Sequence, residues 1–412
     1  MVFFELQRAV AGSGAAPVRA IIRGGGGVGK SYTINCFRRW LAEHSALSSG
    51  CALVLAPTGT AAFNVSGFTL HSKLRLPVPL NQSTFQKLAG PALTELQETF
   101  RNVTAIIVDE MSMVGRRMLR ALDDRLRQAK SRVLEPFGGL SIFLCGDFGQ
   151  LPPVADVEMY SKDKKGGALS MKGVQTWRAF THSIELTVNH RQKEASHFRD
   201  SLWRLRCGEL TMADYEVFAS RGAHVCNDSG FDSAPYLVPT HELEDTHNRE
   251  KLQQLGEPVY AVHAVHCGGK RAKQADDQDA GGLQKVAYFA RGARVMLRKN
   301  MWTPRGLTNG AIGEFVAVVA PETDRMPLAA LVRFPAYTGP SFFAHDPKLV
   351  PVPPHTAHFG VASGGVKALS RTQLPLQLSW AITIHKAQGQ TYDKCIVNLG
   401  HKEGYGASSQ AH

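Results

Sequence analysis

The stretch that most restricts the fold of this chain is RAIIRGGGGVGKSYTINCFRRW, residues 19–40. A short apolar run typical of a strand leads into GGGGVGKS, and a helical pattern follows. The spacing G-x-x-x-x-G-K-S between a strand and a helix predicts a loop whose backbone N–H groups surround phosphate oxygens. The alternative is an ordinary glycine turn before a helix, and the flanking strand and helix disfavour it.

Each position of this loop has a chemical reason. Gly24, Gly27 and Gly29 let the backbone wrap closely around phosphates. Lys30 would place its ammonium on the β- and γ-phosphates, and the Ser31 hydroxyl is a ligand for Mg²⁺. The motif therefore predicts a nucleoside triphosphate site with magnesium.

Short apolar runs and helical patterns alternate over residues 19–154, as in a parallel sheet with crossover helices. Four runs end in conspicuous polar residues: 19–23, 51–56, 104–110 and 141–147. In open parallel sheets the ligand lies at the carboxyl ends of the strands. We therefore expect one site to collect these polar ends.

The run IIVDEMSM, residues 106–113, supplies carboxylates for that site. Asp109 is the candidate ligand of Mg²⁺, and Glu110 is placed to polarise an attacking water. Adjacent carboxylates at a strand end can also be plain solvated surface. Together with the phosphate loop, they favour a hydrolytic nucleoside triphosphatase.

The stretch FLCGDFGQLPPV, residues 143–154, adds a neutral amide. Gln150 can hydrogen-bond a γ-phosphate and report its presence without adding charge. The competing interpretation is a structural turn stiffened by its prolines.

A second strand-and-helix series begins near residue 185 and closes with SWAITIHKAQGQTYDKCIVNLG, residues 379–400. Within it, YLVPT at 236–240 leads into a helical pattern. Between these parts, residues 291–372 hold short strand-like runs joined by Gly, Asn and Pro turns, which indicates a small inserted β-barrel. Residues 268–282 and 351–365 are too polar or too rich in Pro and Gly to pack, so we expect solvated loops.

Length, charge and cysteine content limit the classes of protein to which the chain can belong. A chain of 412 residues is long enough for two core-forming domains. The formal charge of +12 favours a polyanionic partner such as nucleic acid, although a merely soluble basic protein would also carry it. Seven scattered cysteines without C-x-x-C spacing indicate neither a disulfide framework nor a zinc ribbon, and fit a reducing intracellular compartment. No apolar run is long enough for a membrane span.

Six stretches, in this order, resemble the motifs of the PIF-one family of DNA helicases, superfamily one. They are APTGTAAFNVSGFTLHS (56–72), IIVDEMSM (106–113), PFGGLSIFLCGDFGQLPPV (136–154), HRQ (190–192), GARVMLRKN with GLTNGAIGEF (292–300, 306–315), and LPLQLSWAITIHKAQGQTYDKCIVNLG (374–400). The resemblance extends from Gln7 to about Gly400. Its motifs are far more specific jointly than a lone phosphate loop.

The resemblance implies a five-prime to three-prime DNA helicase of α/β fold, with two RecA-like P-loop domains, ATP in the cleft between them and single-stranded DNA across their top. It divides the chain into a first RecA-like domain (1–190) with a wedge-like insertion (about 73–100), a second RecA-like domain (191–290 and 373–412), and an inserted small β-barrel of the Src-homology-three kind (291–372).

The resemblance also assigns residues to the nucleotide. Gln7 would contact the adenine, and Arg191 would be an arginine finger on the γ-phosphate, where a lone arginine would otherwise be surface. Gly389, in the HKAQG turn, would face the nucleotide. Lys30, Ser31, Asp109, Glu110 and Gln150 keep the roles given above.

A further set would bind the DNA backbone through hydroxyl and backbone groups, without reading bases. It comprises Pro57, Thr58, Gly59, His71, Ser72, Thr383, His385 and Lys386. The HKAQG turn would thus touch both ligands, so that closure on ATP changes the grip on DNA. The alternative is a basic turn that caps a strand.

The chain departs from the family pattern at its C-terminus, where a last motif, typically containing ALSR, is missing. The ALSR at 368–371 lies in the wrong place and order, and we expect it to be a decoy. Because a missing arginine finger typically costs about 10³ to 10⁵ in rate, we expect ATP binding with poor hydrolysis.

The stretch 116–132 is basic. We expect it to form a solvated helix with i, i+4 charge pairs and no DNA-binding face.

Three hypotheses of function remain. The first is an ATP-dependent DNA helicase or translocase acting in repair, recombination and telomere or genome maintenance, with ATP, Mg²⁺, single-stranded DNA and forked duplex DNA as ligands. We expect such a helicase to be monomeric, to have no membrane partner, and to be located in the nucleus or the mitochondrion. The second is a catalytically weak ATP-gated DNA-binding protein, derived from a helicase by degeneration, transposition or truncation. The third, a P-loop kinase, predicts substrate turnover without DNA.

Overall fold

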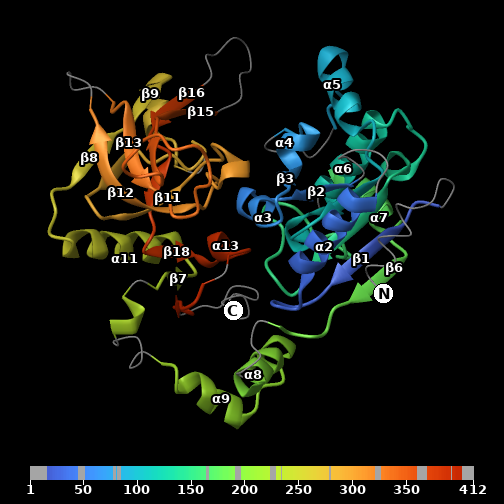
Figure 1. Cartoon of the computed structure of the whole chain (residues 1–412), viewed down its shortest axis with the longest axis horizontal. Helices are drawn as coiled ribbons and strands as arrows, with labels where there is room; N and C mark the ends of the chain where they lie inside the picture. Colours follow the sequence, from blue (N-terminus) through green and yellow to red (C-terminus); the bar gives the residue numbers. More distant parts are fainter. Residues whose placement is uncertain are drawn as a thin grey trace. The chain divides into compact units, whose positions relative to one another are not determined.

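The computed structural model describes residues 16–44, 52–77, 80, 85–163, 167–190, 196–222, 229–232, 234–277, 280–320, 326–359, 369–390 and 392–400. The chain divides into two compact units (Figure 1), unit 1 (Met1–Val225) and unit 2 (Cys226–Lys402). This division falls later than the predicted domain boundary at residue 190. The predicted domain ranges stay predictions.

Unit 1 is built on a parallel sheet of order β3-β2-β4-β5-β1-β6. Its strands are β1 (Arg19–Arg23), β2 (Ala52–Ala56), β3 (Phe68–Thr69), β4 (Ala105–Val108), β5 (Ser141–Gly146) and β6 (His182–Glu185). All four strand runs expected from the sequence form strands of this sheet. The parallel α/β core predicted from the sequence is confirmed.

The described part of unit 1 also contains the helices α2 (Lys30–His44), α3 (Gly59–Asn64), α4 (Leu70–Leu74), α5 (Gly90–Phe100), α6 (Arg116–Ala129), α7 (Gly167–Trp177), α8 (Ser196–Cys207) and α9 (Met212–Ala219). Because successive side chains of a strand point to opposite faces, the two faces of the sheet pack in two separate apolar cores. Ile107 and Phe143 share one core with Phe37 of α2. Ile106 and Ile142 pack in the other, with residues of α5 and α6.

Helix α6 corrects one expectation. The i, i+4 pairs Arg120–Asp124 and Arg127–Asp123 form as predicted. The helix is nevertheless buried, since Arg116, Asp123 and Arg125 are each 1% exposed. Helices α5 and α7 and the 3₁₀ turn η2 (Pro136–Gly139) pack against it, and Asp123 accepts a hydrogen bond from the Phe137 N–H at 2.6 Å. The prediction of a solvated helix is wrong, because charge spacing along a helix does not show which elements cover it.

In unit 2, a small parallel sheet runs in the order β18-β7-β19, and a helix follows two of its strands. It comprises β7 (Tyr236–Val238), β18 (Ala381–Thr383) and β19 (Ile396–Val397), with α11 (His241–Gln254) after β7 and α13 (Ile384–Ala387) after β18. The buried Asn248 of α11 exchanges hydrogen bonds with the backbone of Ala381, at 2.8 and 3.0 Å. This clasp joins segments that lie far apart in sequence.

The rest of unit 2 is mostly β-structure (Figure 1). An antiparallel sheet runs in the order β14-β13-β12-β11-β17, beside the smaller groups β10-β8 and β15-β16-β9. The strands are β8 (Tyr260–His263), β9 (Val265–Cys267), β10 (Val286–Phe289), β11 (Arg294–Leu297), β12 (Ile312–Val319), β13 (Ala329–Arg333), β14 (Leu349–Val352), β15 (His355–Phe359), β16 (Leu369–Gln373) and β17 (Leu376–Leu378). One apolar core joins most of them, with Phe289 stacked on Phe315 at 5.1 Å. Within the predicted barrel range 291–372, the described residues form strands β11 to β15, so the expected short strands are confirmed, and the barrel itself stays a prediction.

Both predicted loops of this region contain a helix or strands where the structure describes them, so the prediction of loops is wrong, although most described residues of 268–282 are exposed as expected. Residues 268–282 contain helix α12 (Gly269–Gln274), with Ala272 and Ala280 fully buried. Residues 351–365 begin in β14 and contain β15. Pro351 lies in β14, which is an edge strand of its sheet and so tolerates a residue without a backbone N–H donor; composition alone misled here.

The ALSR decoy has a structural role. Arg371 lies in β16, is 0% exposed, and donates to Asp277 Oδ1 (2.5 Å) and to the carbonyls of Leu283 (2.7 Å) and Ala275 (2.6 Å). Its guanidinium thus holds together the loop that follows α12. Among the helices that the structure describes, none is both long and apolar enough to cross a membrane.

Candidate nucleotide-binding site

The phosphate loop connects β1 to α2 in unit 1. Gly27 (φ 79°) and Gly29 (φ 87°) adopt left-handed backbone conformations that residues with a Cβ rarely take. A Cβ on Gly24 would collide with the backbone carbonyl of Leu186. Gly24, Gly27 and Gly29 are therefore required by the shape of the loop itself.

The ammonium of Lys30 lies inside this loop. It donates to the carbonyl oxygens of Gly24 at 2.7 Å and Gly25 at 2.8 Å. Ser31 follows in the first turn of α2 with an exposed side chain, and Thr33 donates from both its N–H and its hydroxyl to the Gly29 carbonyl. A phosphate at the loop would compete with the two carbonyls for the ammonium, to which it offers full negative charge.

Asp109 follows β4 and is 5% exposed. Burial, together with the neighbouring Glu110 carboxylate, raises the pKa of its carboxyl to about 7, while the Lys30 charge opposes this shift. Glu110 itself takes a left-handed backbone conformation, φ 54°. A non-glycine residue rarely adopts this conformation, and it marks the turn as one held by its surroundings.

The turn after β5 carries Gln150. Asp147 is 3% exposed, and its carboxylate accepts a hydrogen bond from the Gly149 N–H at 3.0 Å. The Gln150 N–H donates to the Asp147 carbonyl at 3.0 Å. These two bonds fix the turn locally. Because β4, β5 and β1 are neighbours in a parallel sheet, the structure brings Lys30, Asp109 and this turn to one edge of unit 1.

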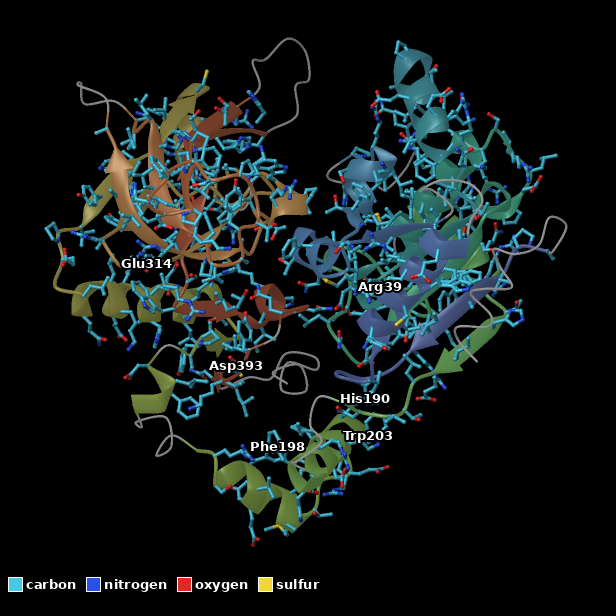
Figure 2. The ribbon with its side chains drawn as sticks, in the orientation of Figure 1. Arg39, His190, Phe198, Trp203, Glu314 and Asp393 are labelled. Carbon is cyan, nitrogen blue, oxygen red and sulfur yellow. The ribbon has the colours of Figure 1, made fainter. Side chains whose placement is uncertain are left out.

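The segment after β6 also lies against the phosphate loop. The His190 N–H donates to the Gly27 carbonyl at 2.8 Å, and the Asn189 amide donates to the Gly26 carbonyl at 3.2 Å. Figure 2 labels His190 at this place and Trp203 on the α8 helix that follows in the chain. Gln7 and Arg191, predicted for the adenine and the γ-phosphate, lie outside the described residues.

Sequence reasoning missed Arg206 of α8. Its guanidinium binds the Asp147 carboxylate with both terminal nitrogens, Nη1 to Oδ2 at 2.5 Å. This ion pair raises the pKa of Arg206. A lone arginine in a helix gives no signal of such a contact in the sequence, since Asp147 lies 59 positions earlier.

The residues predicted to bind DNA in unit 1 begin two short helices. The Thr58 hydroxyl accepts from the Ala61 N–H at 3.2 Å and caps α3, and Gly59 behind it is buried. The Ser72 hydroxyl exchanges hydrogen bonds with Thr69 at the start of α4, and burial lowers the pKa of His71. Pro57 is half-buried. These hydroxyls therefore have partners within unit 1.

In unit 2, the HKAQG turn follows β18. Thr383 is 3% exposed at the N-cap of α13, His385 is exposed, and Gly389 has φ 77°. The Lys386 ammonium lies 2.7 Å from Glu244 Oε1 and 3.2 Å from Gln377 Oε1. Burial lowers the pKa of Lys386, and Glu244 opposes this shift. Lys386 thus has an internal counterion, a partner that the sequence did not reveal.

The oxygen ligands at the unit 1 site suit a Mg²⁺ ion whose remaining coordination positions would be filled by phosphate oxygens. Asp109 supplies a carboxylate and Ser31 a hydroxyl, both hard oxygen ligands. Among the residues that the structure describes, no group of three or more His, Cys, Asp and Glu could hold a metal by itself. Mg²⁺ is commonly bound in proteins through one or two carboxylates together with substrate phosphates and water.

Comparison with known proteins identifies the family. A family model described as PIF1-like helicase matches residues 8–214. The chain belongs to the PIF1-like helicases. It is 29% identical to the ATP-dependent DNA helicase PIF1 of Homo sapiens over 396 residues, which is 94% of this chain and 56% of the human protein. The chain therefore spans about half the length of the curated relatives it matches.

Solved structures agree with the fold of this PIF1-like helicase. The crystal structure of Pif1 helicase from Candida albicans matches with a TM-score of 0.72 and 25% identity, covering 100% of this chain and 90% of that one. Pif1 helicase from Bacteroides, in complex with ADP-AlF3 and ssDNA, matches with a TM-score of 0.72 and 24% identity, covering 100% and 89%. The family resemblance seen in the motifs is confirmed.

Proposed function

We propose that this PIF1-like helicase couples ATP hydrolysis to movement along single-stranded DNA and to unwinding of duplex DNA. The observation that carries the proposal is the convergence of Lys30, Asp109 and the Gln150 turn at the edge of the unit 1 sheet. The human relative, named an ATP-dependent DNA helicase, supports the same activity.

The proposed chemistry follows from the groups at the site. The N–H groups of the phosphate loop and the Lys30 ammonium bind the β- and γ-phosphates. Ser31 and Asp109 would hold Mg²⁺, which when bound neutralises charge that develops on the phosphates. Glu110 orients the attacking water and Gln150 donates to the γ-phosphate. Gln7, Arg191 and Gly389 complete the proposed nucleotide contacts.

Single-stranded DNA and forked duplex DNA are the proposed partners. The net charge of +12 supports a polyanion, and backbone contacts allow movement without sequence readout. The proposed contacts are Pro57, Thr58, Gly59, His71, Ser72, Thr383, His385 and Lys386, and the Lys386 ammonium would have to exchange Glu244 for a phosphate.

The finer architecture belongs to the same proposal. We assign two RecA-like domains, a small barrel of the Src-homology-three kind within the β-rich part of unit 2, and a wedge-like element at about 73–100. The antiparallel five-stranded sheet supports the barrel. Monomeric action in the nucleus, in repair, recombination and telomere maintenance, is the proposed biological setting, with a mitochondrial location as the alternative.

The proposal is tested by ATP hydrolysis with and without single-stranded DNA, beside Lys30→Ala. We expect DNA-stimulated turnover in the wild-type chain and its loss in the variant. Unwinding of a partial duplex that carries only a five-prime or only a three-prime single-stranded tail then reports polarity, and we expect unwinding from the five-prime tail. Intact ATP and DNA binding without turnover would contradict the helicase and favour an ATP-gated DNA-binding protein.

A further inference from the structure

We propose that Arg206, on α8, is a positioning residue for the turn 147–150, which carries the candidate sensor Gln150, and that it links α8 to the bound nucleotide. The inference rests on the proposed ATP hydrolysis. The motifs that identified the family do not include Arg206.

The first observation is a two-pronged ion pair. Both terminal nitrogens of Arg206 bind the two carboxylate oxygens of Asp147, with Nη1 2.5 Å from Oδ2. The Asp147 side chain is 4% exposed, so little water competes for it. A planar guanidinium on a carboxylate fixes orientation as well as distance, which a single hydrogen bond does not.

The second observation is that the same carboxylate organises the turn. Asp147 Oδ1 accepts from the Gly149 N–H at 3.0 Å. A Cβ on Gly149 would collide with the guanidinium of Arg206, so the arginine packs directly on the turn. Any movement of this turn must therefore move Arg206 or break the ion pair.

The third observation is that α8 also reaches the phosphate loop. The Trp203 ring lies 4.0 Å from the position that a Cβ on Gly25 would occupy, and the Arg206 guanidinium lies 5.6 Å from the centroid of this ring. Figure 2 shows Trp203 on α8. One helix thus contacts the turn that carries the sensor and the loop that would bind phosphate.

The fourth observation is that α8 is braced. Asp214 of α9 is fully buried and accepts from Ser201 at 2.6 Å and from Arg204 Nε at 2.7 Å, both on α8. Asp214 also forms a capping box with Thr211. A shift at Asp147 would therefore move α8 and α9 together. A nucleotide can cause such a shift only if it binds one arrangement of the turn more tightly than the other.

The test separates positioning from folding. Arg206→Lys keeps the charge but loses the planar fork, and Asp147→Asn removes the carboxylate while keeping an acceptor for the Gly149 N–H. The control is Arg199→Gln on the same helix, whose partner is the exposed Asp200. We expect kcat to fall on the order of tenfold in both variants, with KM for ATP within about threefold. The double variant should be no slower than the slower single one, and the control should match the wild type.

A second readout does not depend on turnover. Binding of ADP should change the tryptophan fluorescence of the wild-type chain, and Trp203→Phe identifies the part due to Trp203. We expect this part to shrink in Arg206→Lys at saturating ADP. Thermal unfolding of each variant shows that it is folded, so that lost stability is not mistaken for lost positioning.

The outcomes distinguish the two proposals. A wild-type chain without ATP turnover overturns the proposed function, and the fluorescence measurement then decides the role of Arg206. The inference is overturned if Arg206→Lys turns over ATP within about twofold of an active wild type, if Trp203 gives the same ADP response in both, or if Trp203 gives none in the wild type.

Discussion

The Lys386 ammonium lies 2.7 Å from Oε1 of Glu244, a carboxylate that is fully buried in unit 2. Gln377 donates to the same oxygen at 3.1 Å, and His241 Nδ1 lies 2.8 Å from the other. The lysine of the HKAQG turn is thus neutralised inside the unit that carries it. This relationship joins the first turn of α11 to a turn more than a hundred residues later.

Glu244→Gln should therefore destabilise unit 2. The change leaves Lys386, whose side chain is only 17% exposed, without its counterion, and breaking such a pair from one side costs about 3 kcal/mol. Urea unfolding of the variant measures the loss, with the exposed Glu242→Gln on the same helix as control. The double variant Glu244→Gln, Lys386→Gln should recover part of it. Equal stability of Glu244→Gln and the control would contradict this account.

Asp109 should make the metal-free protein less stable as pH rises. Its folded pKa of about 7 lies above the ordinary 3.8, so the native state favours the protonated form, and stability is lost as pH rises from about 4 to about 7. The full shift corresponds to about 4 kcal/mol.

Asp109→Asn, which stays neutral, should remove this loss. The gain over wild type in the free energy of unfolding should be larger at pH 7.5 than at pH 5, in the presence of a chelator. The exposed Glu135→Gln serves as control. An Asp109→Asn gain that is equal at both pH values would disprove the pKa assignment.

Arg371→Met should separate structure from catalysis at the ALSR sequence. Removing the buried guanidinium leaves the Asp277 carboxylate and two carbonyls without their donor, which costs about 3 kcal/mol. The ATPase rate per folded molecule, measured below the unfolding transition, should stay near that of the wild type. The exposed Arg291→Gln is the matched control. A large fall in kcat without lost stability would instead indicate a role toward phosphate.

Thr58→Ala should weaken both α3 and DNA binding. The Thr58 hydroxyl caps α3, and loss of such a cap costs about 1 kcal/mol. Thr58→Ser keeps the hydroxyl and should restore the unfolding midpoint and the affinity for single-stranded DNA, measured at one fixed salt concentration. Full DNA affinity in Thr58→Ala would remove this residue from the proposed interface.

Several parts of this protein were accessible from local sequence. The phosphate loop is one, because its glycines and Lys30 act within a few positions of one another and between a recognisable strand and helix. The strands of the unit 1 sheet are another, because apolar runs ending in polar residues predict buried parallel strands and a site at their carboxyl ends. The ordered motifs identified the PIF-one family for the same reason.

Other parts were decided only by the tertiary structure. Burial of α6, the pairing of Asp147 with Arg206, the counterion of Lys386 and the role of Arg371 all depend on contacts between distant positions. A charged residue has the same local pattern whether it faces water or a buried partner, and the difference lies in which element covers it. The sequence by itself determined the chemistry of the phosphate loop and the family, whereas packing determined which charges are free to act.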